Sequence, residues 1–188
     1  MICVIFVLMQ IEEIRSSDIQ HFNVKGDDRF PNSTLQVILY KGILHLPFLF
    51  SASVVRQLFR KNNYRNFWKA GVYTYHHYHS NTHEVMAVIK GKTILQIGGP
   101  KGKKITIEKG DVLIIPAGVA HKNLKKENDV TCVGAYPNGK KWDMNYGKAD
   151  ERPKADKMIK KVKLPKRDPL FGKEGGIKKF WKETRKTR

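Results

Sequence analysis

Between Gly71 and Tyr136 the chain is a succession of short runs rich in β-branched and aromatic residues, separated by turns that contain glycine, asparagine or aspartate. Several short strands at this spacing are typical of a β-sandwich or β-barrel. No internal repeat of solenoid length accompanies them. We therefore predict an all-β fold, an antiparallel sandwich that closes into a barrel. The predicted strands are 72–75, 84–89, 93–97, 105–107, 112–115 and 131–136.

Two further elements are predicted before Gly71. Residues 35–40 have strand character and end before Lys41-Gly42. Residues 51–61 form the one short helix that we expect, because their apolar positions recur at helical spacing. Ser53 is a suitable residue to cap this helix, and Asn62-Asn63 is its stop signal.

Length and cysteine content indicate a single-domain protein of a reducing compartment. The 188 residues, 40% of them hydrophobic, suit one domain with appendages. Two cysteines, Cys3 and Cys132, form no disulfide framework and fit a reducing compartment, and Cys132 lies in an apolar stretch typical of a buried, unreactive thiol. The apolar run 1–9 is too short to span a bilayer and lacks the marks of a signal peptide, so we expect a soluble cytoplasmic protein. Two interpretations of this run stay open, an additional strand and an extension upstream of a true start at Met9.

The basic charge is concentrated near the C-terminus. The chain has 36 Lys and Arg against 17 Asp and Glu, and the segment from Lys154 onward contributes 14 against 4, a net +10 of the total +19. We predict one β-barrel domain over 1–147, with N-terminal strands and its core at 34–137. A basic C-terminal extension over 148–188 is predicted to pack on the barrel as a strap. A tail that only binds nucleic acid has little use for apolar residues, and no basic patch interleaved with aromatics supports that role. The candidate apolar anchors are Met158, Ile159, Val162, Leu164, Leu170, Phe171, Phe180 and Trp181.

Two stretches hold five of the seven histidines. On an extended strand His77 and His79 project to one face, because residues two apart share a face, while His76 and Tyr78 project away. Glu84 can close on the same point after a loop, and the turn at 116–118 returns the chain at His121. Three imidazoles and a carboxylate suit one divalent transition metal ion, Fe, Mn, Ni, Cu or Zn. The four groups would be costly to bury together without such an ion.

Several residues near these four are weaker candidates. His83 and His76 are possible pocket residues, but each is expected to lie beside the ligands or on the surface instead of binding the metal. Tyr75 and Tyr78 flank the ligands and are expected to pack, although either hydroxyl is a candidate for lining the pocket. Trp142 is predicted to pack at the end of the barrel.

The spacing of the two stretches is that of a known family. Residues 71–91 match G(X)5HXH(X)4E(X)6G and residues 110–121 match G(X)5PXG(X)2H, so the chain resembles the cupin superfamily in both of its motifs. Lys125 stands where the family often has Asn. A wider set of segments looks like the YjlB-like single-domain bacterial cupins, among them Tyr75–Ser80, Gly134–Pro137 and Leu164–Pro169. This resemblance implies a jelly-roll, or double-stranded β-helix, barrel with a C-terminal extension, and it implies no established reaction.

Three functional hypotheses follow. The leading one is an enzyme that acts on a small polar or anionic metabolite at the metal, by dioxygenase, isomerase or decarboxylase chemistry, all of which occur in cupins. The second is a non-catalytic small-molecule binding or sensory cupin, and the third is a nucleic-acid-associated protein that acts through the basic tail. We also expect a homodimer and no membrane partner, because cupin barrels tend to pair and an open sheet edge needs cover.

Overall fold

The computed structural model describes residues 10–11 and 19–181. Residues 1–9, and with them Cys3 and both interpretations of the apolar run, lie outside this range. Within it, no helix has the length and apolar character needed to cross a bilayer. The strands are β1 (Gln10–Ile11), β2 (Ile19–Val24), β3 (Ser33–Tyr40), β4 (Leu44–His45), β5 (Tyr64–Ala70), β6 (Glu84–Ile97), β7 (Lys103–Glu108), β8 (Val112–Ile115), β9 (His121–Asn123) and β10 (Val130–Pro137). The helices are α1 (Ser51–Lys61), α2 (Lys154–Ile159) and α3 (Gly176–Phe180), with 3-10 turns η2 (Glu127–Asp129) and η3 (Ala149–Glu151).

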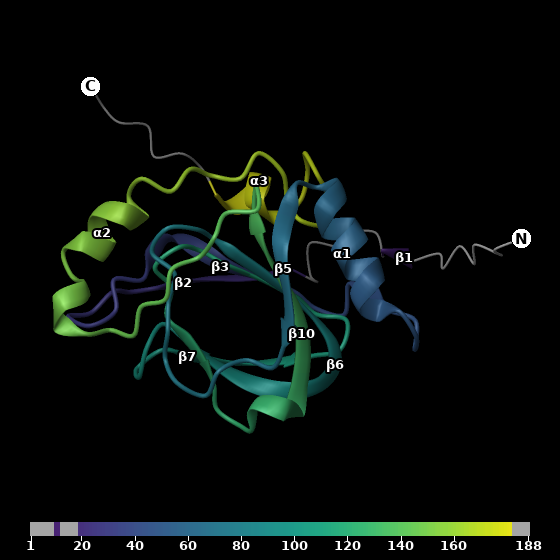
Figure 1. Cartoon of the computed structure of the whole chain (residues 1–188), viewed down its shortest axis with the longest axis horizontal. Helices are drawn as coiled ribbons and strands as arrows, with labels where there is room; N and C mark the ends of the chain where they lie inside the picture. Colours follow the sequence, from purple (N-terminus) through teal and green to yellow (C-terminus); the bar gives the residue numbers. More distant parts are fainter. Residues whose placement is uncertain (1–9, 12–18, 182–188) are drawn as a thin grey trace, which may run out of the picture.

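The main sheet has the order β2-β3-β8-β6-β10-β5, with every pair antiparallel. The second half of β6 leaves this order and pairs with β7 and β9 instead. The first half of β6 therefore belongs to the main sheet and its second half to the sheet formed with β7 and β9. Because β6 joins these two sheets, the strands close around an interior, as Figure 1 shows. The predicted all-β jelly-roll barrel is confirmed.

The predicted turn at Gly91 is instead a bend within one strand. Residues 84–89 and 93–97 were expected as two strands, but they form the single strand β6. Gly91 has φ +79°, and a Cβ there would collide with the carbonyl of Asp129. Glycine at this corner therefore lets β6 change its partners without leaving the sheet.

The predicted strand over 72–75 is wrong. Besides β6, β10 pairs with β5, which ends at Ala70 just before the predicted range. The chain from Gly71 to Thr82 is irregular except for two isolated bridges. Charged residues within β5, and Asn66 with φ +58°, obscure its strand pattern in the sequence. Tyr73 and Tyr75 have strand-like character, yet they lie 41% and 44% exposed at the rim of the barrel.

The helix over 51–61 is confirmed with the predicted bounds, but its cap is not Ser53. The helix begins at Ser51, whose hydroxyl donates a hydrogen bond to the carbonyl of Pro47. Phe50 precedes it in a left-handed conformation, with φ 65°. Asn62-Asn63 ends the helix as predicted, with Asn63 at φ 67°.

Both faces of the sheet are buried. Successive residues of β3 alternate between two core clusters, Val37 and Leu39 in the barrel interior and Ile38 and Tyr40 on the outer face. A sheet that is covered on both faces has continuous apolar strands, as β3 and β8 do. Part of the outer cover is α1, which contributes Val55, Leu58 and Phe59 to the outer cluster.

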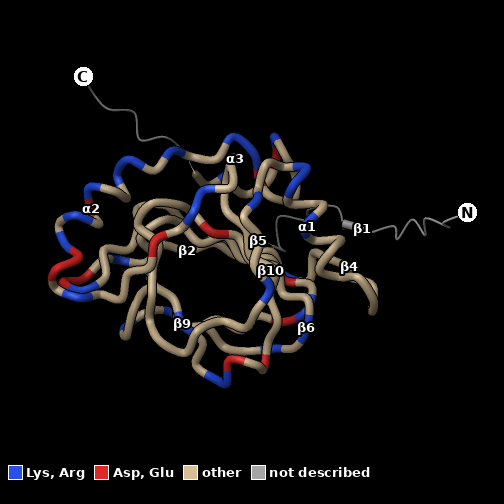
Figure 2. The backbone as a smooth tube through the Cα atoms, in the orientation of Figure 1, with Lys and Arg blue, Asp and Glu red and all other residues tan. Residues whose placement is uncertain are grey.

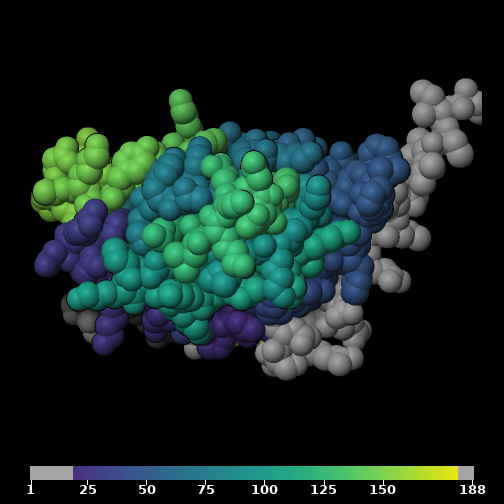
Figure 3. Space-filling model, turned by 90° about the horizontal axis from the view of Figure 1, so that it is seen from below, coloured from purple at the N-terminus to yellow at the C-terminus, as the bar shows by residue number. Residues whose placement is uncertain are grey.

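The rest of the outer cover comes from the C-terminal extension. Leu170, Ile177 and Trp181 are buried in the outer cluster, and Leu164, Phe171 and Phe180 pack against it. Ala155 of α2 shares a smaller cluster with Phe30, so α2 lies beside the loop after β2, as the space-filling view in Figure 3 also shows. Met158 was expected as an anchor but is 38% exposed. Lys and Arg recur along the described part of the extension, at the periphery of the molecule (Figure 2). The division of the chain at residue 147 stays a prediction.

A buried carboxylate joins the extension to the barrel. Asp168 accepts a hydrogen bond from the Tyr40 hydroxyl at 2.6 Å and from the backbone N–H groups of Leu170 at 3.0 Å and Ile177 at 3.3 Å. The Tyr40 hydroxyl in turn accepts one from the N–H of Gly176 at 2.6 Å. These bonds satisfy polar groups that burial would otherwise leave costly.

Cys132 provides a test of the core. Burial raises the pKa of its thiol to about 12. At pH 8 only about one part in ten thousand is then thiolate, which is the reactive form. In a Cys3→Ser variant we expect no measurable reaction with a disulfide reagent until denaturant is added, and one thiol per chain afterwards. Rapid labelling of the native variant would contradict the burial of Cys132.

Candidate metal centre

Four side chains from three parts of the chain meet at one end of the barrel interior. His77 lies in the irregular segment before β6 and forms a two-way backbone bridge with His121 of β9, at 3.2 and 2.9 Å. The ligand nitrogens of His77, His79 and His121 all lie within 4.8 Å of one another. Oε2 of Glu84, the first residue of β6, is 3.6 Å from Nε2 of His79 and 3.4 Å from Nε2 of His121. The structure thus brings together the four residues predicted as ligands.

Each of the three imidazoles is oriented by a backbone carbonyl. A carbonyl only accepts, so Nδ1 carries the proton and donates, and the lone pair of Nε2 is free to face the cluster. The same arrangement orients metal-bound histidines in general. The Nδ1···O distances are 3.2 Å from His77 to Tyr75, 2.5 Å from His79 to Asp143 and 3.2 Å from His121 to Val119.

Glu84 is oriented by two residues that the sequence did not point to. Its Oε1 accepts hydrogen bonds from the Tyr136 hydroxyl at 2.7 Å and from the Trp68 indole N–H at 3.2 Å. Oε2 is left to face the histidines. Trp68 belongs to β5 and Tyr136 to β10, so only the pairing of these strands brings them to Glu84.

The charge state of the cluster follows from burial and mutual contact. Burial, then the neighbouring His121, lowers the pKa of His77 to about 3. Burial by itself would lower the pKa of His79, but the charge of Glu84 and the hydrogen bond to it raise that pKa. Burial would raise the pKa of Glu84, and His79 and His121 outweigh it and hold the pKa well below its usual range.

This donor set fits a divalent transition metal ion. An ionised carboxylate that is 4% exposed needs positive charge beside it, and a bound cation supplies that charge when the three imidazoles are neutral ligands. Nitrogen and carboxylate donors in this proportion suit Fe, Mn, Ni, Cu or Zn, and the residues that would hold the ion are His77, His79, Glu84 and His121.

A loop after β10 holds His79 in place. The carboxylate of Asp143 accepts hydrogen bonds from the backbone N–H of Ser80 at 2.7 Å, the Ser80 hydroxyl at 2.5 Å and the Asn145 amide at 3.0 Å. Burial opposes ionisation of Asp143, and these bonds nonetheless lower its pKa. Sequence reasoning missed Asp143, because its role depends on a contact between segments about sixty residues apart.

The weaker candidates divide into two groups. His76 and Tyr78 turn away from the cluster, as predicted, and their rings lie 5.4 and 6.3 Å from that of Phe30. His83 also points away, since its Nδ1 accepts a hydrogen bond from the N–H of Ala117 at 3.0 Å. Tyr75 stands at the rim, with its ring 5.8 Å from that of His77.

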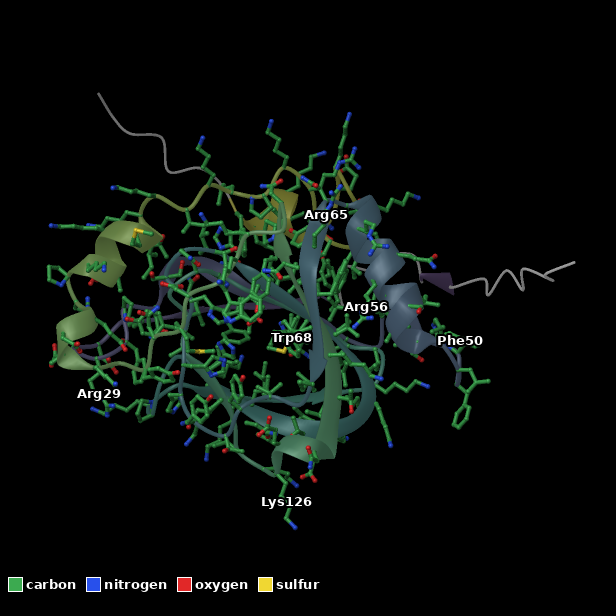
Figure 4. The ribbon with its side chains drawn as sticks, in the orientation of Figure 1. Arg29, Phe50, Arg56, Arg65, Trp68 and Lys126 are labelled. Atoms are coloured by element: carbon green, nitrogen blue, oxygen red, sulfur yellow. The ribbon has the colours of Figure 1, made fainter. Side chains whose placement is uncertain are left out.

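A cavity of about 110 Å³ opens above the four residues. Trp142 packs as predicted, stacked on Tyr136 at 4.8 Å and 16°, and it also forms part of the cavity wall. Figure 4 shows Trp68 inside the ring of strands, whereas Arg29 and Lys126 lie at the periphery. The lining residues are Trp68, Ala70, Gly71, Val72, Tyr73, His77, His79, Glu84, Met86, His121, Tyr136, Trp142 and Met144.

The hydroxyl of Tyr136 can be tested alone. We expect Tyr136→Phe to weaken metal binding by about 10- to 100-fold, the usual cost of losing a residue that orients a ligand. Titration of the chelated protein with a metal and its chromophoric competitor measures this. Tyr78→Phe is the matched control, because that hydroxyl donates to Glu151 at 3.0 Å and not to the cluster. Equal metal affinity in both variants would show that Tyr136 does not hold Glu84 for the ion.

Comparisons with known proteins agree with this geometry. A family model described as a cupin domain matches residues 66–133. Uncharacterized protein YjlB of Bacillus subtilis (strain 168) is 37% identical over 163 residues, which cover 86% of this chain and 96% of that protein.

Similar solved structures include acireductone dioxygenase from Bacillus anthracis with a cadmium ion in its active centre, at 14% identity and a TM-score of 0.37 over 50% of this chain and 64% of that one. A cupin-2 domain containing protein from Shewanella frigidimarina NCIMB 400 is 33% identical, with a TM-score of 0.32, over 40% of this chain and 72% of that one. Structural matches this weak say nothing about function. The identity to YjlB over nearly all of that protein, together with the matched cupin domain, shows that this chain belongs to the YjlB-like cupins.

Proposed function

We propose that the protein is a metal-dependent cupin enzyme that acts on a small molecule with a polar or anionic group. One observation carries the proposal. The free Nε2 lone pairs of three histidines and one oxygen of Glu84 converge at the floor of a cavity. A site that served only to stabilise the fold would have no need of a cavity above it.

The chain's own residues define what the site can do. The bound ion supplies Lewis acidity, or one-electron chemistry if it is redox-active. His77, His79, His121 and Glu84 would hold it at the floor of the cavity, and the cavity would be left for a substrate. Tyr136 and Trp68 keep Glu84 in position, and the apolar wall limits water around the reacting group.

Apart from the four candidate ligands, the acid–base groups in the described cavity lining are two tyrosine hydroxyls. Tyr136 already donates to Glu84, and Tyr73 stands 41% exposed at the rim. Activation of the substrate therefore rests on the metal centre, which suits dioxygenase, isomerase or decarboxylase chemistry that begins with an oxygen donor.

The test starts with the purified, metal-analysed protein. Candidate metabolites are screened by thermal shift, and those that stabilise it are assayed for product formation and oxygen consumption. We expect turnover that disappears on chelation and returns with the metal. A ligand that stabilises the protein at saturating concentration, with no product formed, would favour the non-catalytic binding or sensory alternative.

The expected homodimer is also a proposal. Phe48, Leu49 and Phe50 are 93%, 61% and 70% exposed, which gives an apolar surface beside α1 that a second copy could cover. Light scattering at micromolar concentration should give twice the chain mass of 21.7 kDa. A single species at the chain mass would contradict the dimer.

A further inference from the structure

We infer that the cavity selects a flat aromatic ligand with a single anionic oxygen-donor group. This inference rests on the proposed function, since the donor group is taken to bind at the metal. It narrows the substrate class from any small polar molecule to one with a ring. The argument depends on the cavity walls, their charge, the space available and the position of Trp142.

The walls above the metal ligands are aromatic and apolar. Trp68, Tyr73 and Trp142 present rings to the cavity, and Met86 and Met144 add flexible thioether side chains. Aromatic rings favour stacked or edge-on contact with another ring, and methionine sulfur also packs well against rings. A ligand made only of polar groups would find almost no hydrogen-bonding partners on this wall.

The charge of the cavity limits the charge of the ligand. The chain carries a formal +19, yet no Lys or Arg is among the described lining residues, and Glu84 is the one charged side chain there. A divalent ion with Glu84 and three neutral imidazoles has a net charge of +1. One anionic group on the ligand balances this charge, and a second would be desolvated without a partner.

The space suits one ring. An apolar cavity of about 150 Å³ in another protein binds benzene. The cavity here measures about 110 Å³ and is open to solvent on one side. A single ring therefore fits against the wall with its donor group at the metal, and larger substituents extend through the mouth.

Trp142 is the wall residue that is best placed to recognise the ring. Its indole is stacked on Tyr136 at 4.8 Å and lies 6.4 Å from the ring of His79. The adjacent Asp143 is fixed by Ser80, so the loop that carries Trp142 is held against the metal ligands. A residue held in this way loses little conformational freedom when a ligand binds.

Two hydroxamates test the inference on the full-length, zinc-loaded protein. Acetohydroxamate and benzohydroxamate have the same metal-binding group. The first carries a methyl group beside it, and the second carries a phenyl ring. Isothermal titration should give at least about tenfold tighter binding of benzohydroxamate, in line with one ring–wall contact. Oxalate, which carries two charges and no ring, should bind more weakly than benzohydroxamate.

Two substitutions assign the preference to the wall. Trp142→Ala should bring the ratio of the two hydroxamate affinities close to one while acetohydroxamate still binds, and Trp142→Phe should keep most of the ratio. Metal content is measured in each variant. Equal binding of both hydroxamates by the wild-type protein would overturn the inference and leave the metal site standing. Failure of both to bind a protein that holds its zinc would remove the proposed function, and the inference with it.

Discussion

Replacing His77 and His121 together with alanine lowers the bound metal from about one ion per chain to less than about a tenth of that. Their rings lie 4.2 Å apart and their backbones are bridged, so the double substitution removes half of the donor set from one place. The two remaining candidate ligands, His79 and Glu84, cannot retain a transition metal ion during dialysis. The affinity for the metal falls steeply with each ligand that is lost. Elemental analysis after dialysis measures the content.

The matched control is His76→Ala, since His76 is adjacent to His77 and turns toward Phe30 instead of the cluster. It should keep its metal. The wild-type protein should also melt at a higher temperature with metal than after chelation, because an ion that binds only the folded state stabilises it by mass action. The double variant should show no such difference. Full metal content in the double variant would mean that the ion binds elsewhere.

The clustering of the four candidate ligands was predictable because the information that brings them together is local. His77, His79 and Glu84 lie within eight residues, and the spacing of histidines in an extended segment already fixes which of them share a face. His121 needed only the turn at 116–118. The extended segment turned out to be irregular, yet the bridge from His77 to His121 keeps the alternation that the prediction used.

The residues that support the ligands were not predictable for the opposite reason. Trp68, Tyr136 and Asp143 reach the site through strand pairing and a long-range loop contact, and neither leaves a local pattern. The same limit explains the misplaced strand at 72–75. A tyrosine-rich segment at a cavity rim has the amino-acid composition of a strand. The sequence alone does not distinguish such a segment from a true strand, whereas the register of β5 against β10 does.

The extension illustrates how composition can predict a role without predicting geometry. Its apolar residues indicated packing against the barrel despite the charge, and Leu170 and Trp181 are indeed buried. Asp168 gave no such signal, although it is 1% exposed and bonded to Tyr40. A buried acid among lysines can be recognised only when its partners are known.

Trp181→Ala should lower the free energy of unfolding by about 3–5 kcal/mol, the cost of truncating a large buried side chain. Trp181 is 4% exposed, and its indole N–H donates to the carbonyl of Gln36 at 2.8 Å. Its ring also lies 4.7 Å from that of His83. The loss leaves a cavity between the extension and β3 and one unpaired carbonyl.

For a chain of this length the melting temperature should fall by roughly 10 °C, while the metal content stays the same. Trp181→Phe, which retains most of the apolar volume, should lose less. Removing all residues after Gly147 takes Leu170 and Ile177 out of the core as well, so the fall should be larger. These changes are measured by thermal unfolding in the chelated state, where metal binding does not contribute. If Trp181→Ala left stability unchanged but abolished a salt-sensitive affinity for RNA or DNA, the extension would be a recognition element. Truncating a buried anchor lowers the stability, whereas truncating a solvent-facing contact residue lowers the affinity for the partner and leaves the stability unchanged.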